Sequence, residues 1–445
     1  MTIGTPLHGK TFSIIIQGCR TNQYEGDAIA AMLEKAGAVH NESGPDIAVI
    51  VSCTITAVTD RKCRKILRRL RRENHDAVIV ACGCYAQKMT EEERVELGVD
   101  IVVGNRLKYK LPQLLAEQFV NATNTPQIIN DKYILSETSW DHLELDKPRL
   151  HSRAFLKVQD GCSHYCSYCI VPYVRGKPVS RDMDGSVAEA KKIVESGCPE
   201  VVLTGVHIGL YENLPELVKR IGSINGLHRL RFGSIEPFAV TNELLSVLAD
   251  TPTFCRHLHM PLQSGDDNVL ASMRRGYTSK EFAAIAANAR KYLGDEAHIS
   301  TDLMVGFPTE DDSAFRNSVD FIKEIRFGKI HVFPYSPREG TDAASMKQIP
   351  ASAVKERVKE ALETAEGLHR EYCSRWIGKS VSILVEENDG KMMRGLTPYY
   401  VRVAAESDGT NVSQETEIIP KRYDSGLLIS GNARGISKDD FQEIL

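Results

Sequence analysis

Cys162, Cys166 and Cys169 fall within one short stretch, GCSHYCSYC, which begins at Gly161. A structural zinc site takes four protein ligands and closes its coordination shell. Three thiolates can instead hold three corners of a 4Fe-4S cube. The fourth iron then stays open, and a small molecule with an amine and a carboxylate could chelate it. The spacing leaves one alternative, a zinc knuckle completed by His164 or by a distant cysteine.

Three further cysteines each follow an apolar, β-branched run. Cys19 comes after TFSIIIQ, Cys53 after DIAVIVS, and Cys84 at the end of AVIVACGC. Because the carboxyl ends of neighbouring parallel strands lie along one edge of a sheet, these thiols could meet in space. The residues alone also fit buried free cysteines. Cys82 is expected to point to the same side of its strand as Cys84.

The segment RKCRKILRRLRR, residues 61–72, combines an apolar stripe with unmixed positive charge. Its apolar side chains follow helical spacing, and its Lys and Arg residues have no acid among them. Such crowding is costly unless phosphates neutralise it, so the segment predicts contact with a nucleic-acid backbone. A basic surface without a specific partner is the alternative.

The first part of the chain, which must position these residues, alternates strand and helix patterns. Through residue 120, short strand runs alternate with amphipathic helices at 25–35 and 60–72, which predicts a small parallel α/β sheet. Residues 121–149 are polar and lack sustained periodicity, and we interpret them as a linker.

A second block repeats strand and helix patterns about six times, which predicts a full or partial barrel. Polar motifs follow its strands, where such barrels carry their chemistry: QDGC, LTGVH, SIEP, PLQSG, VGFP and FPYS. Two expected capping boxes, Ser186–Glu189 and Thr278–Glu281, mark helix starts.

From about residue 378 the pattern changes to short strands separated by Gly, Asn and Asp turns, which predicts a small β-barrel. This tail mixes cations with aromatic residues: Lys391, Arg394, Tyr399, Tyr400 and Arg402. Aromatic rings among cations suit unpaired bases, although the same tyrosines could fill the core of a small barrel.

The length and composition of the chain favour a soluble protein of two or three domains. The chain has 445 residues, 42% of them apolar and 26% charged. It contains no apolar run of about 18 residues, so we expect no membrane span and a cytoplasmic location. Eleven cysteines, an odd number, favour metal or iron–sulfur ligation over paired disulfides. The net charge of −4 does not by itself indicate a nucleic-acid binder.

These motifs together resemble the methylthiotransferases of the radical S-adenosylmethionine (SAM) superfamily. The resemblance spans nearly the whole chain and rests on these segments: GCYAQ, VQDGCSHYCSYCIVPYVRGKPVSR, VVLTGVHIG, SIEP, HLHMPLQSGDDNVLASMRR and HVFPYSPREGT. Within the family, the chain is most similar to the bacterial branch that modifies threonylcarbamoyladenosine in tRNA.

The resemblance implies an α/β protein of three modules. An N-terminal parallel α/β sheet domain at residues 10–120 would carry an auxiliary cluster. A radical SAM core, a partial (β/α)6 barrel, would span 148–377, and a small β-barrel TRAM domain 378–442. The implied cofactors are SAM and two 4Fe-4S clusters, and the implied metal ligands are Cys19, Cys53, Cys84, Cys162, Cys166 and Cys169.

Further site residues come from the matched motifs. The candidates for the SAM pocket are Thr204, Gly205, Glu236, Gln263, Ser264, Asp302, Val332 and Phe333. The candidates for tRNA contact are Arg61, Arg64, Lys65, Arg68, Arg72, Arg394 and Arg402. We expect Arg175 to bind a phosphate or carboxylate beside the cluster. The cysteines predicted to be packing residues are Cys63, Cys198, Cys255 and Cys373.

The implied reaction is methylthiolation of C2 of N6-threonylcarbamoyladenosine at position 37 of tRNA, through a SAM-derived 5′-deoxyadenosyl radical and the second cluster. The expected partners are the tRNA with that modified base and an electron donor such as flavodoxin or ferredoxin. Three alternatives stay open. The substrate could be isopentenyladenosine 37 of tRNA or a ribosomal-protein aspartate, or the chain could be a non-catalytic, zinc-stabilised RNA-binding protein.

Overall fold

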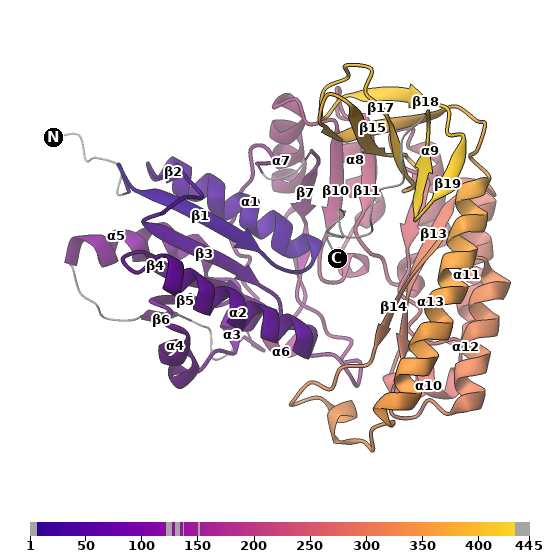
Figure 1. The fold of residues 1–445 in the computed structure, drawn as a ribbon, viewed down its shortest axis with the longest axis horizontal. Coiled ribbons are helices and arrows are strands. Elements are labelled where there is room, and N and C mark those ends of the chain that lie inside the picture. Colours follow the sequence, from indigo (N-terminus) through magenta and orange to yellow (C-terminus); the bar gives the residue numbers. More distant parts are fainter. Residues whose placement is uncertain (1–6, 122–126, 130–133, 137, 150–151, 432–445) are drawn as a thin grey trace.

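The computed structural model describes residues 7–121, 127–129, 134–136, 138–149 and 152–431. An N-terminal parallel sheet, a central strand–helix region and a C-terminal sheet follow one another along the chain (Figure 1). Among these residues, no helix is long and apolar enough to cross a membrane.

The N-terminal sheet has six parallel strands in the order β2-β1-β3-β4-β5-β6. The strands are β1 (Thr11–Ile16), β2 (Val39–His40), β3 (Ile47–Ser52), β4 (Val78–Gly83), β5 (Ile101–Val103) and β6 (Gln127–Ile129). The helices are α1 (Arg20–Lys35), α2 (Ala57–Glu73), α3 (Cys84–Gln87), α4 (Glu91–Leu97) and α5 (Leu111–Asn121). The predicted parallel sheet is confirmed, but β6 lies inside the segment predicted as a linker and pairs with β5.

Both faces of this sheet are buried, which is why its strands read as continuous apolar runs. On one face, alternate residues of β3 and β4 pack with α1 and α5. On the other face, the remaining residues pack with α2, α3 and α4. The carboxyl ends of β1, β3 and β4 lie along one edge of this parallel sheet, where side chains can serve a site.

The central region contains six parallel strands in two sheets, β11-β10-β7 and β12-β13-β14. These strands are β7 (Ala154–Lys157), β10 (Glu200–Thr204), β11 (Arg229–Phe232), β12 (His257–His259), β13 (His298–Val305) and β14 (Lys329–Pro334). The two sheets meet at β11 and β12, where Ile235 N donates to His259 O at 2.9 Å. Six parallel strands thus succeed one another in chain order, as the predicted partial barrel requires. A short antiparallel pair, β8 (Gln159–Asp160) and β9 (Val179–Ser180), lies beside the first strand.

Helices pack around these strands and bury one large apolar core and a second, smaller cluster that includes Val269 and Met273 of α10. They are α6 (Val171–Arg175), α7 (Met183–Glu195), α8 (Leu214–Gly222), α9 (Asn242–Asp250), α10 (Asp267–Met273), α11 (Ser279–Leu293), α12 (Asp312–Ile325) and α13 (Ala351–Ser374). The capping box Thr278–Glu281 is confirmed at α11. The box expected at Ser186 is wrong, because Asp182 caps α7 one turn earlier by accepting from Gly185 N at 2.7 Å.

The tail forms one mixed, mainly antiparallel sheet in the order β18-β15-β16-β17-β20-β19. Its strands are β15 (Val381–Asn388), β16 (Met392–Leu396), β17 (Arg402–Glu406), β18 (Glu415–Ile418), β19 (Arg422–Asp424) and β20 (Leu427–Ile429). Within the described residues, the edge strands β18 and β19 do not pair with each other. The expected closed barrel is thus replaced there by an open strand order, and residues 432–442 of the predicted module lie outside the described part.

Two buried arginines of β11 hold the C-terminal sheet against the central region. Arg231, which is 1% exposed, donates to Thr397 O at 2.6 Å and to Pro398 O at 3.0 Å. Arg229 donates to Leu396 O and to the Glu415 carboxylate, both at 2.5 Å. The sheet therefore supplies acceptors that these buried cations need.

Candidate active site

Cys19, Cys53 and Cys84 meet at the carboxyl edge of the N-terminal sheet. Cys19 caps α1, Cys53 follows β3, and Cys84 opens α3 directly after β4. All three line one cavity of about 200 Å³. Burial raises the pKa of Cys53 well above its usual value, and the neighbouring Cys19 and Cys84 raise it further. The predicted meeting of the three thiols is therefore what the fold produces.

Two glycines explain how the chain brings these thiols together and separates Cys82 from them. Gly18 has φ +118°, and a Cβ there would lie 2.4 Å from the Cys53 Cβ, so only glycine allows this approach. Gly83, with φ +94°, turns the chain at the end of β4 before Cys84. Cys82 consequently packs in the apolar core under α1 and α5. The expectation that it shares a side with Cys84 is wrong.

Cys162, Cys166 and Cys169 form the second set, on the loop after β8. Burial raises the pKa of Cys162 to about 11 and that of Cys169 to about 12, and the nearby Cys166 raises both. Gly161 has φ +73° and would place a Cβ only 2.0 Å from Lys177 O, so the loop turns where no larger residue fits. The loop presents its three thiols next to one another, as the spacing predicted.

His164 does not complete a zinc site with these cysteines. Its backbone N donates to Cys162 Sγ at 3.4 Å, while its ring contacts Arg275 O through Nε2 at 3.2 Å and stacks on Phe238. Within the described ranges, no three His, Cys, Asp or Glu side chains are placed to bind a single metal ion. The four remaining cysteines are buried as predicted packing residues: Cys63, Cys198, Cys255 and Cys373.

Each thiol set has a buried guanidinium beside it. Arg175 Nε donates to Cys84 Sγ at 3.1 Å, and Arg275 Nη1 donates to Cys166 Sγ at 3.4 Å. Burial raises the pKa of Cys84, and the Arg175 guanidinium opposes that rise, which favours the thiolate that binds metal. Sequence reasoning placed Arg175 beside a cluster but missed Arg275, whose only sequence signal is its position in the motif MRRGYT.

Arg175 also joins the N-terminal sheet to the central region. Its Nη1 donates to Glu25 Oε1 at 2.8 Å and to Asp160 Oδ1 at 3.2 Å, and its Nη2 donates to Asn22 at 2.8 Å. Glu25 and Asn22 belong to α1, whereas Asp160 belongs to β8. Arg175 was expected to bind a phosphate or carboxylate, and its carboxylate partners in this structure are internal.

The ion pairs of Glu25 extend this contact into a buried charge network. Lys157 Nζ lies 2.9 Å and Lys108 Nζ 3.4 Å from Glu25 Oε1, and Lys108 also lies 3.2 Å from Asp141. With Arg175 and Asp160, three cations balance three carboxylates, and all are at most 2% exposed. Burial alone would raise the pKa of Glu25, but Arg175, Lys108 and Lys157 outweigh it and hold that pKa well below its usual value.

The cavity of the N-terminal thiols adjoins a second cavity that contains Cys169. Ile55, Ile170 and Val171 line both. The residues between the two thiol sets are thus apolar, which limits the access of water to the space between them.

Five of the eight candidates for the SAM pocket line one of these two cavities. Thr204 and Gly205 line the cavity of the N-terminal thiols. Gln263, Asp302 and Phe333 line the cavity of Cys169. The other three candidates line neither: Glu236 pairs with Arg275 at 2.5 Å, the Ser264 hydroxyl contacts that of Ser318 at 3.2 Å, and Val332 packs on the central core.

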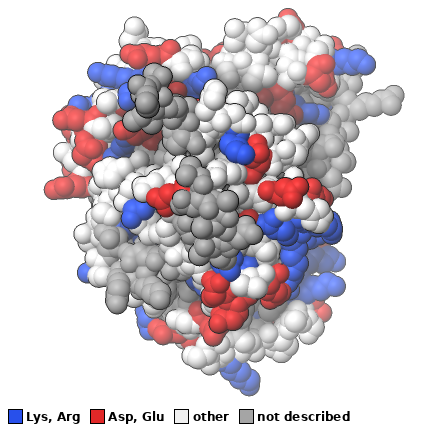
Figure 2. Space-filling model, turned by 90° about the vertical axis from the view of Figure 1, so that its left-hand side faces the viewer, with Lys and Arg blue, Asp and Glu red and all other residues white. Residues whose placement is uncertain are grey.

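The basic helix α2 buries Asp60, Cys63, Leu67 and Leu70 and presents most of its Lys and Arg side chains outward. Of the tRNA candidates on it, Arg68 pairs with Glu96 at 2.5 Å, Arg64 with Glu93 at 3.8 Å, and Arg72 with Glu73 at 3.7 Å. In the described part of the chain, Arg61 and Lys65 form no ion pair. Figure 2 shows Lys and Arg side chains gathered toward its right-hand edge and charges of both signs over the rest of that face.

The candidates of the tail are less exposed than expected. Arg394 pairs with Glu387 at 2.8 Å, and Tyr399 packs on Trp376 in the core of the C-terminal sheet. Tyr400 stacks on His257 with ring centroids 4.2 Å apart, and Arg402 lines a cavity beside it. The tyrosines thus follow the alternative in which they pack inside the protein.

Comparisons with known proteins agree with this arrangement. The model of the Radical SAM superfamily matches residues 156–322, and that of the uncharacterized protein family UPF0004 matches residues 11–104. The threonylcarbamoyladenosine tRNA methylthiotransferase MtaB of Bacillus subtilis is 35% identical over 87% of this chain and 88% of its own. The tRNA-2-methylthio-N(6)-dimethylallyladenosine synthase of Moorella thermoacetica is 32% identical over 85% and 87%.

Among solved structures, the radical SAM methyltransferase TsrM of Kitasatospora setae superposes with a TM-score of 0.58. It is 15% identical and covers 75% of this chain and 77% of its own, so the likeness concerns the fold. The fold and the C-x3-C-x2-C loop define a radical SAM enzyme. More particularly, the chain belongs to the family of radical SAM tRNA methylthiotransferases.

Replacing Glu25 with Gln is expected to lower the free energy of unfolding at neutral pH by about 3–5 kcal/mol, because three buried cations lose a shared carboxylate. Glu34→Gln, at the exposed end of the same helix, is the matched control and should cost at most about 1 kcal/mol. Urea denaturation of the apoprotein measures both. Equal losses in the two variants would contradict the analysis.

Comparing wild type with Glu25→Gln at several pH values tests whether folding lowers the pKa of Glu25. A carboxyl group whose pKa is lower in the folded than in the unfolded protein stabilises the fold above the unfolded pKa, about 4.3 for Glu. That stabilisation is lost as the pH falls through the folded pKa. The difference between wild type and Glu25→Gln should therefore be constant near neutral pH and shrink below about pH 4.

Proposed function

We propose that the chain methylthiolates C2 of N6-threonylcarbamoyladenosine at position 37 of tRNA. The observation that carries this proposal is that Cys19, Cys53 and Cys84 line one cavity and that Cys169, from the second set of three thiols, lines the adjoining one. Removing a hydrogen from a carbon and attaching sulfur to it require two reactive centres that face one substrate position. Holding both beside one bound base replaces encounters in solution by a fixed geometry.

In this proposal Cys162, Cys166 and Cys169 hold the 4Fe-4S cluster that binds SAM, and Cys19, Cys53 and Cys84 hold the second cluster. Three thiolates on a four-iron cluster leave one iron without a protein ligand, which suits both roles. When bound, these cofactors supply the radical that removes the C2 hydrogen and the sulfur and methyl group that replace it.

The residues around the thiols have supporting roles. Arg175 and Arg275 donate hydrogen bonds to the sulfurs of Cys84 and Cys166 and would help to hold them in place. Gln263 lines the cavity of Cys169, and in the described structure its buried Oε1 has no hydrogen-bond partner, so it can accept from the amine or a hydroxyl of SAM. Ile170 and Val171 keep water from the space between the two sets. The electron that SAM cleavage needs would come from a flavodoxin or ferredoxin.

The domain roles proposed follow the same division. Residues 10–120, extended by β6, would form the methylthiotransferase domain with the second cluster. Residues 148–377 would form the radical SAM core, and 378–442 a TRAM domain. The target adenine must leave its stack to reach the cavities, as bases do in other enzymes that modify them.

The choice of the threonylcarbamoyl substrate draws on the relatives. The Bacillus subtilis protein and its Thermotoga maritima counterpart, 33% identical, carry that substrate in their names. The Moorella thermoacetica protein, 32% identical, is named for the dimethylallyl substrate, so isopentenyladenosine is the second candidate. These relatives give no support to a ribosomal-protein aspartate or to non-catalytic zinc-stabilised RNA binding.

Iron analysis tests the cluster ligands. Anaerobically reconstituted wild type should hold about eight irons per chain, and Cys166→Ala and Cys84→Ala about four each. Cys82→Ala changes a thiol two residues from Cys84 that lies in the apolar core, and it should retain about eight. Iron-free wild type would overturn the cluster proposal, and so would a loss in Cys82→Ala equal to that in Cys84→Ala.

Mass spectrometry of tRNA nucleosides tests the reaction and its substrate. A strain without this gene should lose 2-methylthio-N6-threonylcarbamoyladenosine and accumulate the form that lacks the methylthio group. The wild-type gene should restore the product, whereas Cys166→Ala should not. If only the isopentenyl product disappears, the second candidate is the correct one.

Salt-dependent binding tests the contact between α2 and tRNA. Arg61→Gln and Lys65→Gln should each reduce the slope of log Kd against log salt by about 0.7–0.9, the value for one lost phosphate contact. Lys291→Gln on α11 is the control and should leave the slope unchanged. Unchanged slopes in all three variants would show that α2 does not bind the RNA backbone.

A further inference from the structure

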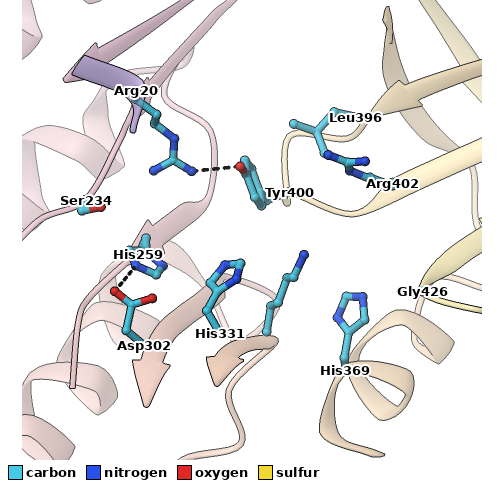
Figure 3. A pocket seen from close by; sticks show the side chains of 11 residues that line it. Arg20, Ser234, His259, Asp302, His331, His369, Leu396, Tyr400, Arg402 and Gly426 are labelled. Carbon is cyan, nitrogen blue, oxygen red and sulfur yellow. Dashed lines mark hydrogen bonds and ion pairs between the residues drawn. The ribbon is translucent and has the colours of Figure 1, made fainter. Parts of the chain in front are cut away.

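A third cavity, of about 170 Å³, lies between the central strands and the C-terminal sheet. The central strands contribute His259, Asp302, Lys329 and His331, and the C-terminal sheet contributes Tyr400 and Arg402 (Figure 3). Arg20, the residue after Cys19, reaches it from the N-terminal domain. Each of the three parts of the chain thus supplies side chains to this cavity.

Positive charge dominates the walls of this cavity. Among the described residues that line it, three are permanent cations, Arg20, Lys329 and Arg402, and one is a carboxylate, Asp302. That carboxylate already contacts His259 Nε2 at 3.3 Å, and His331 lies beside the same His259 with ring centroids 5.6 Å apart. A partly enclosed space with an excess of cations favours an anionic occupant.

Tyr400 gives an independent sign of this field. Burial by itself would raise the pKa of its hydroxyl, but the guanidiniums of Arg20 and Arg153 outweigh burial and lower the pKa to about 8. Arg20 Nη2 donates to the Tyr400 oxygen at 2.9 Å, as the dashed line in Figure 3 marks. The surroundings of the cavity therefore stabilise negative charge on an oxygen atom.

The third cavity adjoins the cavities in which the two thiol sets have members. It shares Arg20 and Ser234 with the cavity of Cys19, Cys53 and Cys84, and it shares Asp302 with the cavity of Cys169. None of the six cysteines lines it. A substrate whose reacting carbon faces the thiols could therefore extend a substituent past Arg20 and Ser234 into this space.

We propose that this cavity receives the carboxylate of the threonylcarbamoyl group, with Arg402 and Lys329 as the residues that determine specificity for it. The inference rests on the proposed function. The threonylcarbamoyl group extends from N6 and ends in a carboxylate several bonds from C2. An isopentenyl group at the same position is uncharged and would gain nothing from the positive charge of these walls.

The SAM carboxylate is not the occupant that this geometry favours. SAM would be held at the open iron of the Cys162, Cys166 and Cys169 cluster, and none of these cysteines lines the third cavity. A backbone phosphate of the RNA is the other anion that could enter. If the occupant is the threonylcarbamoyl carboxylate, RNA binding depends on the N6 substituent, whereas with a backbone phosphate it does not.

Anticodon stem-loop RNAs with one defined base separate these cases. Three RNAs carry threonylcarbamoyladenosine, its carboxamide analogue, or isopentenyladenosine at position 37. Reconstituted enzyme without SAM should bind the carboxylate RNA about tenfold or more tightly than the carboxamide RNA. Arg402→Gln and Lys329→Gln should each bring that ratio close to one by raising the Kd of the carboxylate RNA alone.

Two control variants complete the series. Arg402→Lys keeps the charge and should keep most of the preference. Arg422→Gln changes an exposed arginine of the same sheet, paired with Asp424 at 3.0 Å outside the cavity, and should behave as wild type. Thermal unfolding of each variant establishes that it is folded. With SAM present, the two cavity variants should raise KM for the carboxylate RNA and leave kcat little changed.

The outcomes that overturn the inference are distinct from those that overturn the proposed function. If the cavity variants weaken binding of all three RNAs equally, the anion is a backbone phosphate. If they leave the carboxylate preference intact, the cavity does not bind the substituent. If wild type methylthiolates only the isopentenyl RNA, the proposed function itself fails.

Discussion

The buried charge network around Glu25 is the constraint on which the arrangement of the two thiol sets depends. Its members come from α1, from the segment before α5, from residue 141, and from β7, β8 and α6 of the central region. A buried charge without its partner costs several kcal/mol, so the network favours one relative placement of the N-terminal sheet and the central region. Because Arg175 also donates to Cys84, that placement fixes where the N-terminal thiols lie.

Much of the fold could be predicted from the sequence because its strands are short β-branched runs with strong periodicity. The succession of about six strand–helix units in the central region was expected, and so were the strands β1, β3 and β4 that precede the cysteines. The missed strands have two residues, β2, or lie in a polar segment, β6, where no apolar run marks them. The start of α7 was misplaced because Asp182 and Ser186 are both good caps, and only the surrounding packing decides between them.

The six cysteines were found from motifs, but their partners were not. The contact of Arg275 with Cys166 joins residues 109 positions apart, and that of Arg175 with Cys84 joins residues 91 apart. No local pattern marks such pairs. Glu236 and Ser264 were predicted from their motifs as contacts of SAM. In the structure their side chains bond to Arg275 and Ser318 instead. Long-range ion pairs between buried residues are set by the fold as a whole.

The docking of the C-terminal sheet on β11 bears on how this enzyme can be divided. The backbone carbonyls of Leu396, Thr397 and Pro398 accept from Arg229 and Arg231, which are only 2% and 1% exposed and have little access to water instead. Removing the sheet would strand two guanidiniums inside the remaining protein. In engineering terms, the tail is a structural cover of the catalytic body, and it cannot be cut off or exchanged as an interchangeable RNA-binding attachment.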